Sequence, residues 1–211
     1  MAGQQDSLAS VELSGRWGVL RPLAVGNDSA SIYALSHDSS VELTWRQTKV
    51  GPFGDPAMFD AHVRELVADP YRAFFTVVTP DNEAVGWLCL MEAQGEHRSI
   101  ELGYVLYTTR LQRTTLATEA LYLVMRHAFE LGYARLEWTC TAENDRSRRA
   151  ALRLGLTFEG VMRRKWTLKG VPRDIAMYSL LDSEWPARRT ALEAWLAPDN
   201  FVNGVQVSAL R

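Results

Sequence analysis

The stretch RLQRTTLATEA, residues 110–120, lies at the junction that decides the fold of this chain. It follows an alternating, strand-like run and opens an apolar helical stripe, which is where a phosphate-binding loop would lie. It contains no glycine, although glycine is the residue that most readily adopts unusual backbone dihedral angles close to a ligand. The stretch therefore raises the question of whether a loop built on threonine can still bind a phosphate group.

The segments on either side of this stretch have different hydrophobic periods. Residues 98–107, RSIELGYVLY, alternate between two faces and predict a strand. From Ala117 onward, apolar residues recur at helical spacing until Gly132, which is a natural C-terminal stop. A helix thus joins residues 98–107 to the next strand-like run at 134–141, and a crossover helix returns the chain in the same direction. We expect these two strands to be parallel.

The remaining elements complete a mixed α/β chain. Patterning predicts a strand at residues 16–23, helices at 28–38 and 56–69, a hairpin of strands at 71–79 and 84–93, a helix at 144–155, and late strands at 157–168 and 173–181. We expect one domain at residues 16–185, after a flexible lead at 1–15 and before a C-terminal helix and tail at 186–211. The predicted sheet is mixed, mostly antiparallel and flanked by helices.

Composition narrows the class of partner and the compartment. The 211 residues carry a net charge of −2, so no overall basic field favours nucleic acid. Cys89 and Cys140 lie in apolar strand-like runs, which predicts buried thiols in a reducing compartment. The four histidines have no mutual spacing typical of a metal site. Without a secretory signal or a run of about 18 apolar residues, we expect a soluble cytoplasmic protein with no membrane contact.

Three motifs occur in a characteristic order. LQRTTLATEAL (111–121) opens the central helix, AENDRSRRAALRLGLTFEG (142–160) follows the next strand, and RDIAMYSLLDSEW (173–185) lies near the end. With these motifs the chain resembles the GNAT acyltransferases over residues 16–185, and most of all their RimJ/RimL-like branch of protein N-acetyltransferases. The resemblance implies the GNAT fold, in which the parallel fourth and fifth strands are splayed, with acetyl-CoA as cosubstrate and no metal.

The resemblance also places a cofactor loop at the opening stretch. The family's phosphate loop has the form Gln/Arg-x-x-Gly-x-Gly/Ala, and Gln112, Thr115 and Ala117 stand at its three named positions. The diphosphate of coenzyme A needs free backbone N–H groups that converge at a helix N-terminus. Threonine avoids positive φ, so we expect Thr115 to have a negative φ and to point its N–H at the diphosphate. The residues expected to bind the cofactor here are Arg110, Gln112, Arg113, Thr114, Thr115, Leu116, Ala117 and Thr118. The alternative is that the two adjacent threonines only cap the helix.

A second motif lies on the thiol side of the implied site. Asn144 and Ser147 match the Asn-x-x-Ser that this branch sets beside the pantetheine arm, and an asparagine can both donate to and accept from an amide. A plain N-cap role for Asn144 is supported equally well. Many members place a tyrosine four residues after the serine to protonate the leaving thiolate, but Ala151 stands there. Ser147 is therefore the candidate hydrogen-bond donor on this side.

The implied reaction is the attack of a primary amine on a thioester, which needs a base because the amine is mostly protonated at neutral pH. Glu101 aligns with the acidic residue of many members and shares a strand face with Gly103, where a ligand can approach closely. The competing interpretation is an exposed glutamate on a solvated strand face. Some members use an acid on the sixth strand instead, but Trp166 stands in that region. A backbone N–H near Val105 or Leu106 would hold the oxyanion.

The acceptor side is predicted from aromatic and basic residues. Trp45, Trp87, Trp138 and Trp166 could each line an acceptor pocket, although tryptophans in strands more often pack in the core. Trp45, in the loop-like segment ELTWRQ beside Arg46, is the strongest candidate, and Arg46 and Trp138 join it as expected substrate contacts. Of the four arginines in the 144–155 helix, at least two are expected to be solvated, and the others could meet the 3′-phosphate of coenzyme A or an acidic substrate.

We therefore expect an acetyl-CoA-dependent N-acetyltransferase that acts on an amine-bearing peptide or small molecule, with a homodimer left open. The missing loop glycine, the missing tyrosine and the open identity of the base support a second hypothesis. In it, the chain is a regulatory protein of the same fold that binds coenzyme A without catalysis. A nucleic-acid binder that uses RSRR and RRK is the weakest hypothesis, because the net charge is slightly negative.

Overall fold

The computed structural model describes residues 8, 11–202 and 205–210 of the chain. Within these residues the central feature is an eight-stranded sheet in the order β1-β2-β3-β4-β5-β6-β8-β7. The strands are β1 (Leu13–Ser14), β2 (Val19–Pro22), β3 (Ala73–Val78), β4 (Ala84–Gln94), β5 (Ser99–Tyr107), β6 (Arg135–Thr141), β7 (Thr157–Leu168) and β8 (Val171–Leu181). The helices are α2 (Asn27–Ser36), α3 (Val41–Trp45), α4 (Pro56–Ala68), α5 (Thr115–Glu130), α6 (Asp145–Arg153) and α7 (Trp185–Leu196).

The parallel pairing predicted for the two strands joined by the central helix is confirmed. β5 and β6 run parallel, while the other strand pairs of the described sheet are antiparallel. The β5–β6 ladder covers only Ser99, Ile100 and Glu101 of β5. Because both strands continue well beyond this short ladder, they part and open the sheet toward their C-terminal ends, as the predicted splay requires.

A β-bulge bends β5 at the edge of this opening. Tyr104 and Val105 together stand opposite the single residue Leu88 of β4. Tyr104 has a φ of 51°, in the left-handed region that residues with side chains seldom adopt. A bulge leaves one residue outside the ladder and turns side chains away from the regular alternation. The bulge therefore interrupts the ladder beside the opening between β5 and β6.

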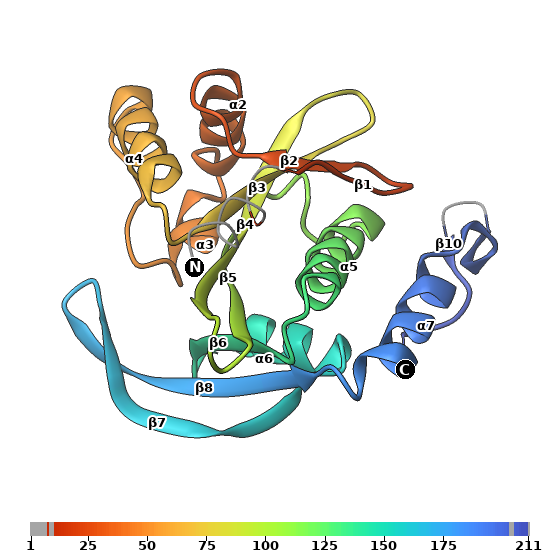
Figure 1. Cartoon of the computed structure of the whole chain (residues 1–211). Helices are drawn as coiled ribbons and strands as arrows, with labels where there is room; N and C mark the ends of the chain where they lie inside the picture. The colour runs from red at the N-terminus through yellow and green to blue at the C-terminus, as the bar shows by residue number, and fades with distance from the viewer. Residues whose placement is uncertain (1–7, 9–10, 203–204, 211) are drawn as a thin grey trace.

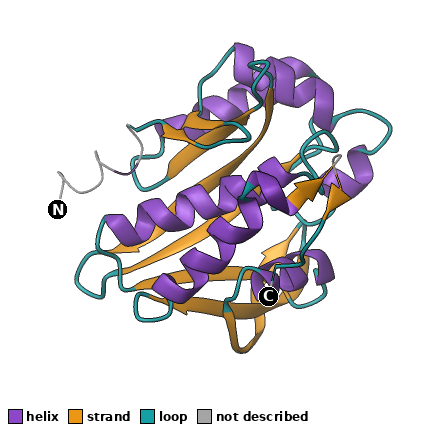
Figure 2. Cartoon of the chain, turned by 90° about the vertical axis from the view of Figure 1, so that its right-hand side faces the viewer, coloured by secondary structure: helices purple, strands orange, loops and turns teal. Residues whose placement is uncertain are grey.

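Helices cover both faces of the sheet, with α2 and α4 on one side and α5 and α7 on the other (Figure 1). Figure 2, seen from the side of α5 and α7, shows helices crossing in front of the strands. The helical spacing predicted for residues 56–69 is confirmed in α4, which buries Phe59, Val63 and Leu66, whereas Met58 and Val67 are exposed. Each face of the sheet thus has its own apolar core.

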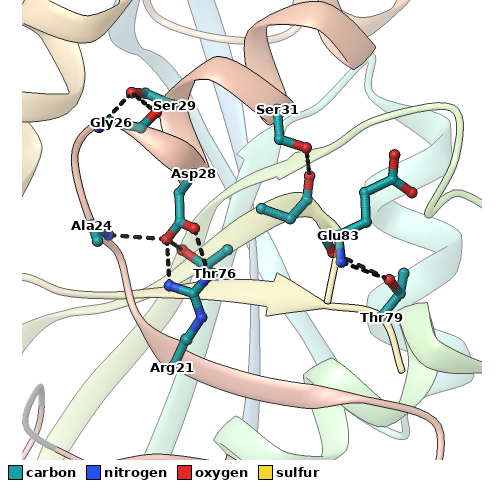
Figure 3. A network of polar contacts seen from close by, with 10 residues as sticks. Arg21, Ala24, Gly26, Asp28, Ser29, Ser31, Thr76, Thr79 and Glu83 are labelled. Carbon is teal, nitrogen blue, oxygen red and sulfur yellow. Dashed lines mark hydrogen bonds and ion pairs between the residues drawn. The ribbon is translucent and has the colours of Figure 1, made fainter. Parts of the chain in front are cut away.

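A buried ion pair joins α2 to the sheet (Figure 3). Asp28 is only 1% exposed, and Arg21 of β2 donates to both of its carboxylate oxygens at 2.9 and 2.7 Å. Thr76 of β3 and the N–H of Ala24 donate to the same carboxylate at 2.8 and 3.1 Å. A buried carboxylate is tolerated when its lone pairs are filled in this way. The network fixes α2 against the sheet. The chain then continues from α2 into α3.

The N-terminal lead is shorter than predicted. Leu13–Ser14 form β1 and pair with β2, and Glu119 of α5 accepts the N–H groups of Arg16 and Trp17, each at 2.7 Å. A Cβ at Gly15 would lie 2.4 Å from the Glu119 carboxylate, so only glycine allows the backbone this close. Glu119 lies more than 100 residues after Arg16 and Trp17, so the local sequence pattern could not predict this contact. Residues 1–7 and 9–10 of the predicted lead lie outside the described residues.

The predicted C-terminal helix is present, but it packs on α5 and not directly over the sheet. The Trp185 ring lies 6.2 Å from that of Tyr122 and 4.9 Å from that of Phe129, both stacked. Tyr122 also donates its hydroxyl to Glu193 at 2.6 Å. A boundary at residue 185 would cut at the first residue of α7, so this helix belongs to the packed domain. A 3-10 turn η1 (Pro198–Asn200) and a hairpin of β9 (Phe201–Val202) and β10 (Val205–Gln206) follow and were not predicted.

Candidate active site

A cavity of about 150 Å³ lies where β5 and β6 part. Its walls come from β4, β5, β6, the start of α6 and the segment after α3, with single residues from α4 and β7. The lining residues are Trp45, Gln47, Thr48, Lys49, Val50, His62, Trp87, Met91, Glu101, Leu102, Gly103, Tyr104, Val105, Leu106, Trp138, Thr139, Cys140, Asn144, Ser147 and Trp166. Because α6 and α4 pack on opposite faces of the sheet, the cavity connects the two faces through the splay.

Glu101 is buried in this cavity and not solvated. Glu101 is 7% exposed, and the Thr139 hydroxyl donates a short hydrogen bond to Glu101 Oε1. A Cβ at Gly103 would lie 3.3 Å from Oε1 of Glu101 and 2.5 Å from Met91, so the glycine leaves room beside the carboxyl. The predicted common face of Glu101 and Gly103 is confirmed. The competing interpretation, an exposed glutamate on a solvated face, is wrong.

The surroundings of Glu101 favour its protonated form. Burial raises the pKa of its carboxyl, and the nearby charges of Glu137 and Glu92 act in the same direction. The hydrogen bond from Thr139 and the charge of Lys49 oppose this rise. A carboxyl whose pKa is raised toward neutrality accepts a proton more effectively than an ordinary glutamate. The environment therefore suits a general base.

Ser147 is held by an indole at the other end of the cavity. Nε1 of Trp138 donates to Ser147 Oγ at 2.9 Å, and the serine hydroxyl can in turn donate to the neighbouring Cys140 sulfur or to a ligand. Asn144 is the N-cap of α6, where its Oδ1 accepts from the Ser147 N–H at 3.2 Å. The cap interpretation of Asn144 is confirmed, and the same side chain lines the cavity. Burial raises the pKa of the neighbouring Cys140 thiol, and both cysteines are free and buried as predicted.

Thr114, and not a glycine, organises the start of α5. It is the N-cap with a φ of −95°, and its hydroxyl accepts from the Ala117 N–H at 3.1 Å and donates to the Leu111 carbonyl at 2.7 Å. Thr115 is the first helical residue and is not among the positive-φ residues, which confirms the prediction for its backbone. The left-handed residue of the loop is Arg113, with a φ of 63°. The loop thus places its strained residue two positions before Thr115.

Two backbone N–H groups at this helix start have no carbonyl partner within the helix. Thr115 and Leu116 lie in the first turn, where helix geometry gives an N–H no carbonyl partner. The N–H of Ala117, in contrast, is taken by the Thr114 hydroxyl. The helix cap and a phosphate site are therefore compatible. That the Thr115 N–H points at a diphosphate stays a prediction.

Other residues predicted for the cofactor loop have partners within the protein. Gln112 donates from Nε2 to the Tyr107 carbonyl at 2.7 Å, which ties the loop to the end of β5. Arg110 forms an ion pair with Glu83 at 3.2 Å, in the turn between β3 and β4. Thr118 is 5% exposed, and its hydroxyl accepts from an arginine of α6 at 3.1 Å. A phosphate contact by Arg110 or Thr118 would have to replace or share these bonds.

The four arginines of α6 divide into two pairs. Arg146 and Arg149 are exposed, as expected for at least two of them. Arg148 donates to a buried tyrosine hydroxyl at 3.2 Å. Arg153 is exposed over much of its surface, but its guanidinium lies over the Trp195 ring at 4.7 Å. Arg148 and Arg153 thus join α6 to β8 and α7, and Arg146 and Arg149 face solvent.

The acceptor side differs in part from the prediction. Trp45 lines the cavity, but it ends a short helix and does not lie in a loop, and it is a core residue that is 2% exposed. Its Nε1 donates to the Ser36 carbonyl at 2.9 Å. Arg46 is exposed and is not a lining residue, because neighbouring side chains on a helical turn diverge by roughly 100°. The structure therefore does not bring the predicted pair together.

The rest of the cavity wall contains the other weighed tryptophans together with residues that were not predicted from the sequence. Trp87, Trp138 and Trp166 all line the cavity beside Trp45, so all four weighed tryptophans do. Lys49 is an additional wall residue, with Nζ 4.6 Å from the centroid of the Trp166 ring. His62 of α4 is another; it falls beside the apolar stripe of its helix, where no sequence signal separates it from a surface histidine. Other additions come from the segment after α3, whose position depends on tertiary contacts, and from β4, β5 and β6.

Comparison with known proteins gives a consistent result. A family model described as Acetyltransferase (GNAT) domain matches residues 19–157. A GCN5-related N-acetyltransferase structure from Brucella melitensis is 35% identical, with a TM-score of 0.92 and coverage of 95% of this chain and 92% of that chain. A probable GNAT-family acetyltransferase from Chromobacterium violaceum is 36% identical, with a TM-score of 0.78 and coverage of 83% and 88%.

A curated relative matches over a shorter span. The Bacillus subtilis (strain 168) protein named "Uncharacterized N-acetyltransferase YoaA" is 29% identical over 100 residues, which are 47% of this chain. The match spans about half of that relative, 56% of its length. With the family model covering most of the chain, and with the splayed β5–β6 pair in place, the chain belongs to the GNAT acetyltransferase family.

Two kinds of feature are absent from the described residues. None of the helices in this part of the chain is long and apolar enough to cross a membrane. In the same residues, no group of three or more His, Cys, Asp or Glu side chains is placed to hold a metal ion.

Proposed function

We propose that this protein is an acetyl-CoA-dependent N-acetyltransferase that moves an acetyl group to a primary amine by direct attack in a ternary complex. The observation that supports this most directly is one cavity with Glu101 on one side of the splay and Ser147 on the other. A base for the amine and a donor for the thiol are needed at opposite ends of one reaction path. Family membership makes acetyl transfer the expected chemistry.

The residues present fit a coenzyme A thioester. The open N–H groups of Thr115 and Leu116 suit its phosphates, since a helix N-terminus attracts anions. Asn144 lines the cavity and can bond a pantetheine amide. The gap between β5 and β6 gives an extended arm a path toward Glu101. Bound acetyl-CoA would supply an acetyl group activated as a thioester.

The roles of the protein groups follow from their positions. Glu101 would take a proton from the acceptor amine, directly or through a water molecule. The backbone N–H near Val105 or Leu106, beside the bulge, would hold the negative charge that develops on the thioester oxygen. Ser147, oriented by Trp138, would donate a hydrogen bond to the leaving thiolate. Trp45 and Trp138 would line the acceptor path.

Finer features belong to the same proposal. The motif order supports membership in the RimJ/RimL-like branch, whose acceptor would be a protein N-terminus or a small aminoacyl or amine compound. The two free, buried cysteines are compatible with a cytoplasmic location, which is part of this proposal. A homodimer is compatible with this proposal and is tested by light scattering.

Calorimetry with acetyl-CoA tests the central claim. We expect saturable binding, and free-thiol release when an amine panel is added. Lack of binding at millimolar acetyl-CoA would overturn the proposal. Binding without thiol release on any amine or peptide would favour the other hypothesis, a regulatory protein that binds coenzyme A.

A further inference from the structure

The two carboxyl oxygens of Glu101 have different surroundings. Oε1 accepts a hydrogen bond from the Thr139 hydroxyl. No residue in the described part of the chain donates to Oε2, and Oε2 is not one of the sealed side-chain atoms that lack a partner. Because Glu101 lines the cavity, Oε2 is the carboxyl oxygen that remains available to a molecule there.

The hydrogen bond to Oε1 crosses the opening between β5 and β6. Glu101 and Glu137 are the last pair of the β5–β6 ladder. Thr139 lies two residues further along β6, so it is on the same face of that strand as Glu137. The Thr139 hydroxyl therefore reaches back to Glu101 from beyond the end of the ladder, where the two backbones no longer bond to each other.

Gly103 leaves the space that this hydrogen bond needs. It follows Glu101 by two residues on β5 and shares its face. A Cβ at Gly103 would lie 3.3 Å from Oε1 of Glu101, the same oxygen that Thr139 contacts. The Glu101 side chain thus extends along β5 over the glycine, in the direction of the opening, and a larger residue at 103 would crowd the bonded oxygen.

The hydrogen bond from Thr139 is one of several influences on the Glu101 carboxyl. Burial raises its pKa most, and Thr139 is the largest influence that lowers it. The other charged or titratable groups near it are Glu137 of β6, Glu92 and Cys89 of β4, and Lys49 of the segment after α3. The Glu137 carboxylate is itself bonded to Arg135 Nε at 2.7 Å. Loss of the Thr139 hydroxyl alone would leave all these groups in place.

We propose that Thr139 is a positioning residue, whose hydroxyl holds Oε1 of Glu101 across the opening so that Oε2 faces the acceptor amine. This deepens the proposed acetyl transfer and rests on it. A carboxylate fixed through one oxygen keeps the other in a set direction, and proton transfer depends strongly on such alignment. Thr139 acts through Glu101 and does not itself exchange a proton with the amine.

Thr139→Val tests this role because valine keeps the branched shape and removes the hydroxyl. The pH at which kcat/KM reaches half of its maximum should move upward, since the bond that favours the carboxylate is lost. Above that pH, kcat should still fall by about threefold to tenfold, because the ionised carboxyl is no longer aligned. Acetyl-CoA affinity should not change. Thr139→Ser keeps a hydroxyl and should restore both quantities.

The controls separate this effect from a general loss of structure. Thr157→Val makes the same chemical change at an exposed position of β7 outside the cavity, and it should keep the parent pH profile. All variants use the same amine, so the ionisation of the amine is common to every profile. If thermal unfolding shows that Thr139→Val does not fold, Thr139→Ala removes the same hydroxyl without adding a methyl group.

The outcomes distinguish this inference from acetyl transfer itself. Turnover by Thr139→Val with the parent pH profile and kcat overturns the inference and leaves the acetyltransferase proposal intact. A fall in kcat that Thr139→Ser does not restore overturns it as well.

If no amine releases thiol, the proposed function fails, and a titration of Glu101 itself then decides. Carboxyl 13C resonances of labelled glutamate are followed against pH, and the resonance absent from Glu101→Gln belongs to Glu101. A higher titration midpoint in Thr139→Val than in the parent, with the parent value in Thr139→Ser, supports the bond to Oε1. Equal midpoints in the parent and in Thr139→Val overturn it.

Discussion

At the scale of one residue, the buried carboxyl of Glu101 is costly to ionise, but the same burial suits the role of a general base. Burial raises the pKa of its carboxyl above the ordinary value, with Thr139 and Lys49 opposing the shift. The carboxyl therefore releases its proton only as pH rises through this raised pKa. Natural active sites commonly keep such unfavourable groups because the reaction needs them.

Replacement of Glu101 by glutamine tests its role in turnover. We expect kcat to fall by roughly 100-fold to 10,000-fold, the range of a general base, with little change in the calorimetric affinity for acetyl-CoA. The kcat/KM of the parent should rise with pH through the pKa of Glu101, and the variant should lack this rise. The exposed Glu96→Gln serves as control. An unchanged rate would assign the proton transfer to water or to another residue.

The same substitution should stabilise the fold near neutral pH. The folded-state pKa of Glu101 is raised, so its contribution to stability is fully present below the unfolded-state pKa and is lost as pH rises through the folded-state pKa. Glu101→Gln removes this loss. Urea unfolding should show the variant more stable than the parent at about pH 7, with the difference shrinking toward about pH 4. A difference independent of pH would contradict the assignment.

The start of α5 gives a second prediction at the residue scale. Thr114→Ala removes the N-cap and should lower the free energy of unfolding by about 1 kcal/mol. Thr115→Gly restores the family's glycine, but Thr115 needs no positive φ, so acetyl-CoA affinity should not improve. Calorimetry and urea unfolding measure the two effects. Tighter binding by Thr115→Gly would show that the threonine costs the loop part of its function.

At the scale of elements, contacts between distant segments hold the acceptor wall in place. Lys169, in the turn between β7 and β8, donates from Nζ to the Trp45 carbonyl at 2.7 Å. Thr141 at the end of β6 donates its hydroxyl to Gln47 at 3.0 Å. Together they fix the segment after α3 against the sheet. Three elements that are remote in sequence thus shape one side of the cavity.

Lys169→Met tests this contact because it keeps the aliphatic stem and removes the donor. We expect the acceptor KM to rise about threefold with acetyl-CoA affinity unchanged, and the unfolding free energy to fall by no more than about 1 kcal/mol. Lys165→Met, at an exposed position of β7, is the matched control. Equal KM values in both variants would mean that the segment is held without Lys169.

At the scale of the whole molecule, α7 completes the core. Trp185→Ala removes a ring that stacks on Tyr122 and Phe129, and it should lower the free energy of unfolding by about 3–5 kcal/mol. Phe158→Ala, at a ring that is 45% exposed, should cost much less. Urea unfolding compares the two. Similar small losses would mean that α7 is a dispensable tail.

Local patterning was sufficient for most elements but not for their contacts. The strand at 98–107 and the helix from Thr115 were readable because their hydrophobic periods differ. The cavity role of His62 was not readable, since its position depends on how α4 packs. Arg46 was misjudged because a short helix replaced the expected loop. The early end of the lead depends on Glu119, more than 100 residues away.

The sequence by itself determined the order of the main elements apart from β1, α3 and the η1–β9–β10 segment, and also the parallel pair, the helix start at Thr114 and the candidacy of Glu101 and Ser147. The elements, their pairing and the helix start follow from periodicity and capping, which act within a few residues. The candidacy of Glu101 and Ser147 follows from the resemblance to the family. Only the tertiary structure decided that Glu101 is buried and that one cavity joins it to Ser147. Burial and convergence are properties of packed elements, and no local pattern records them.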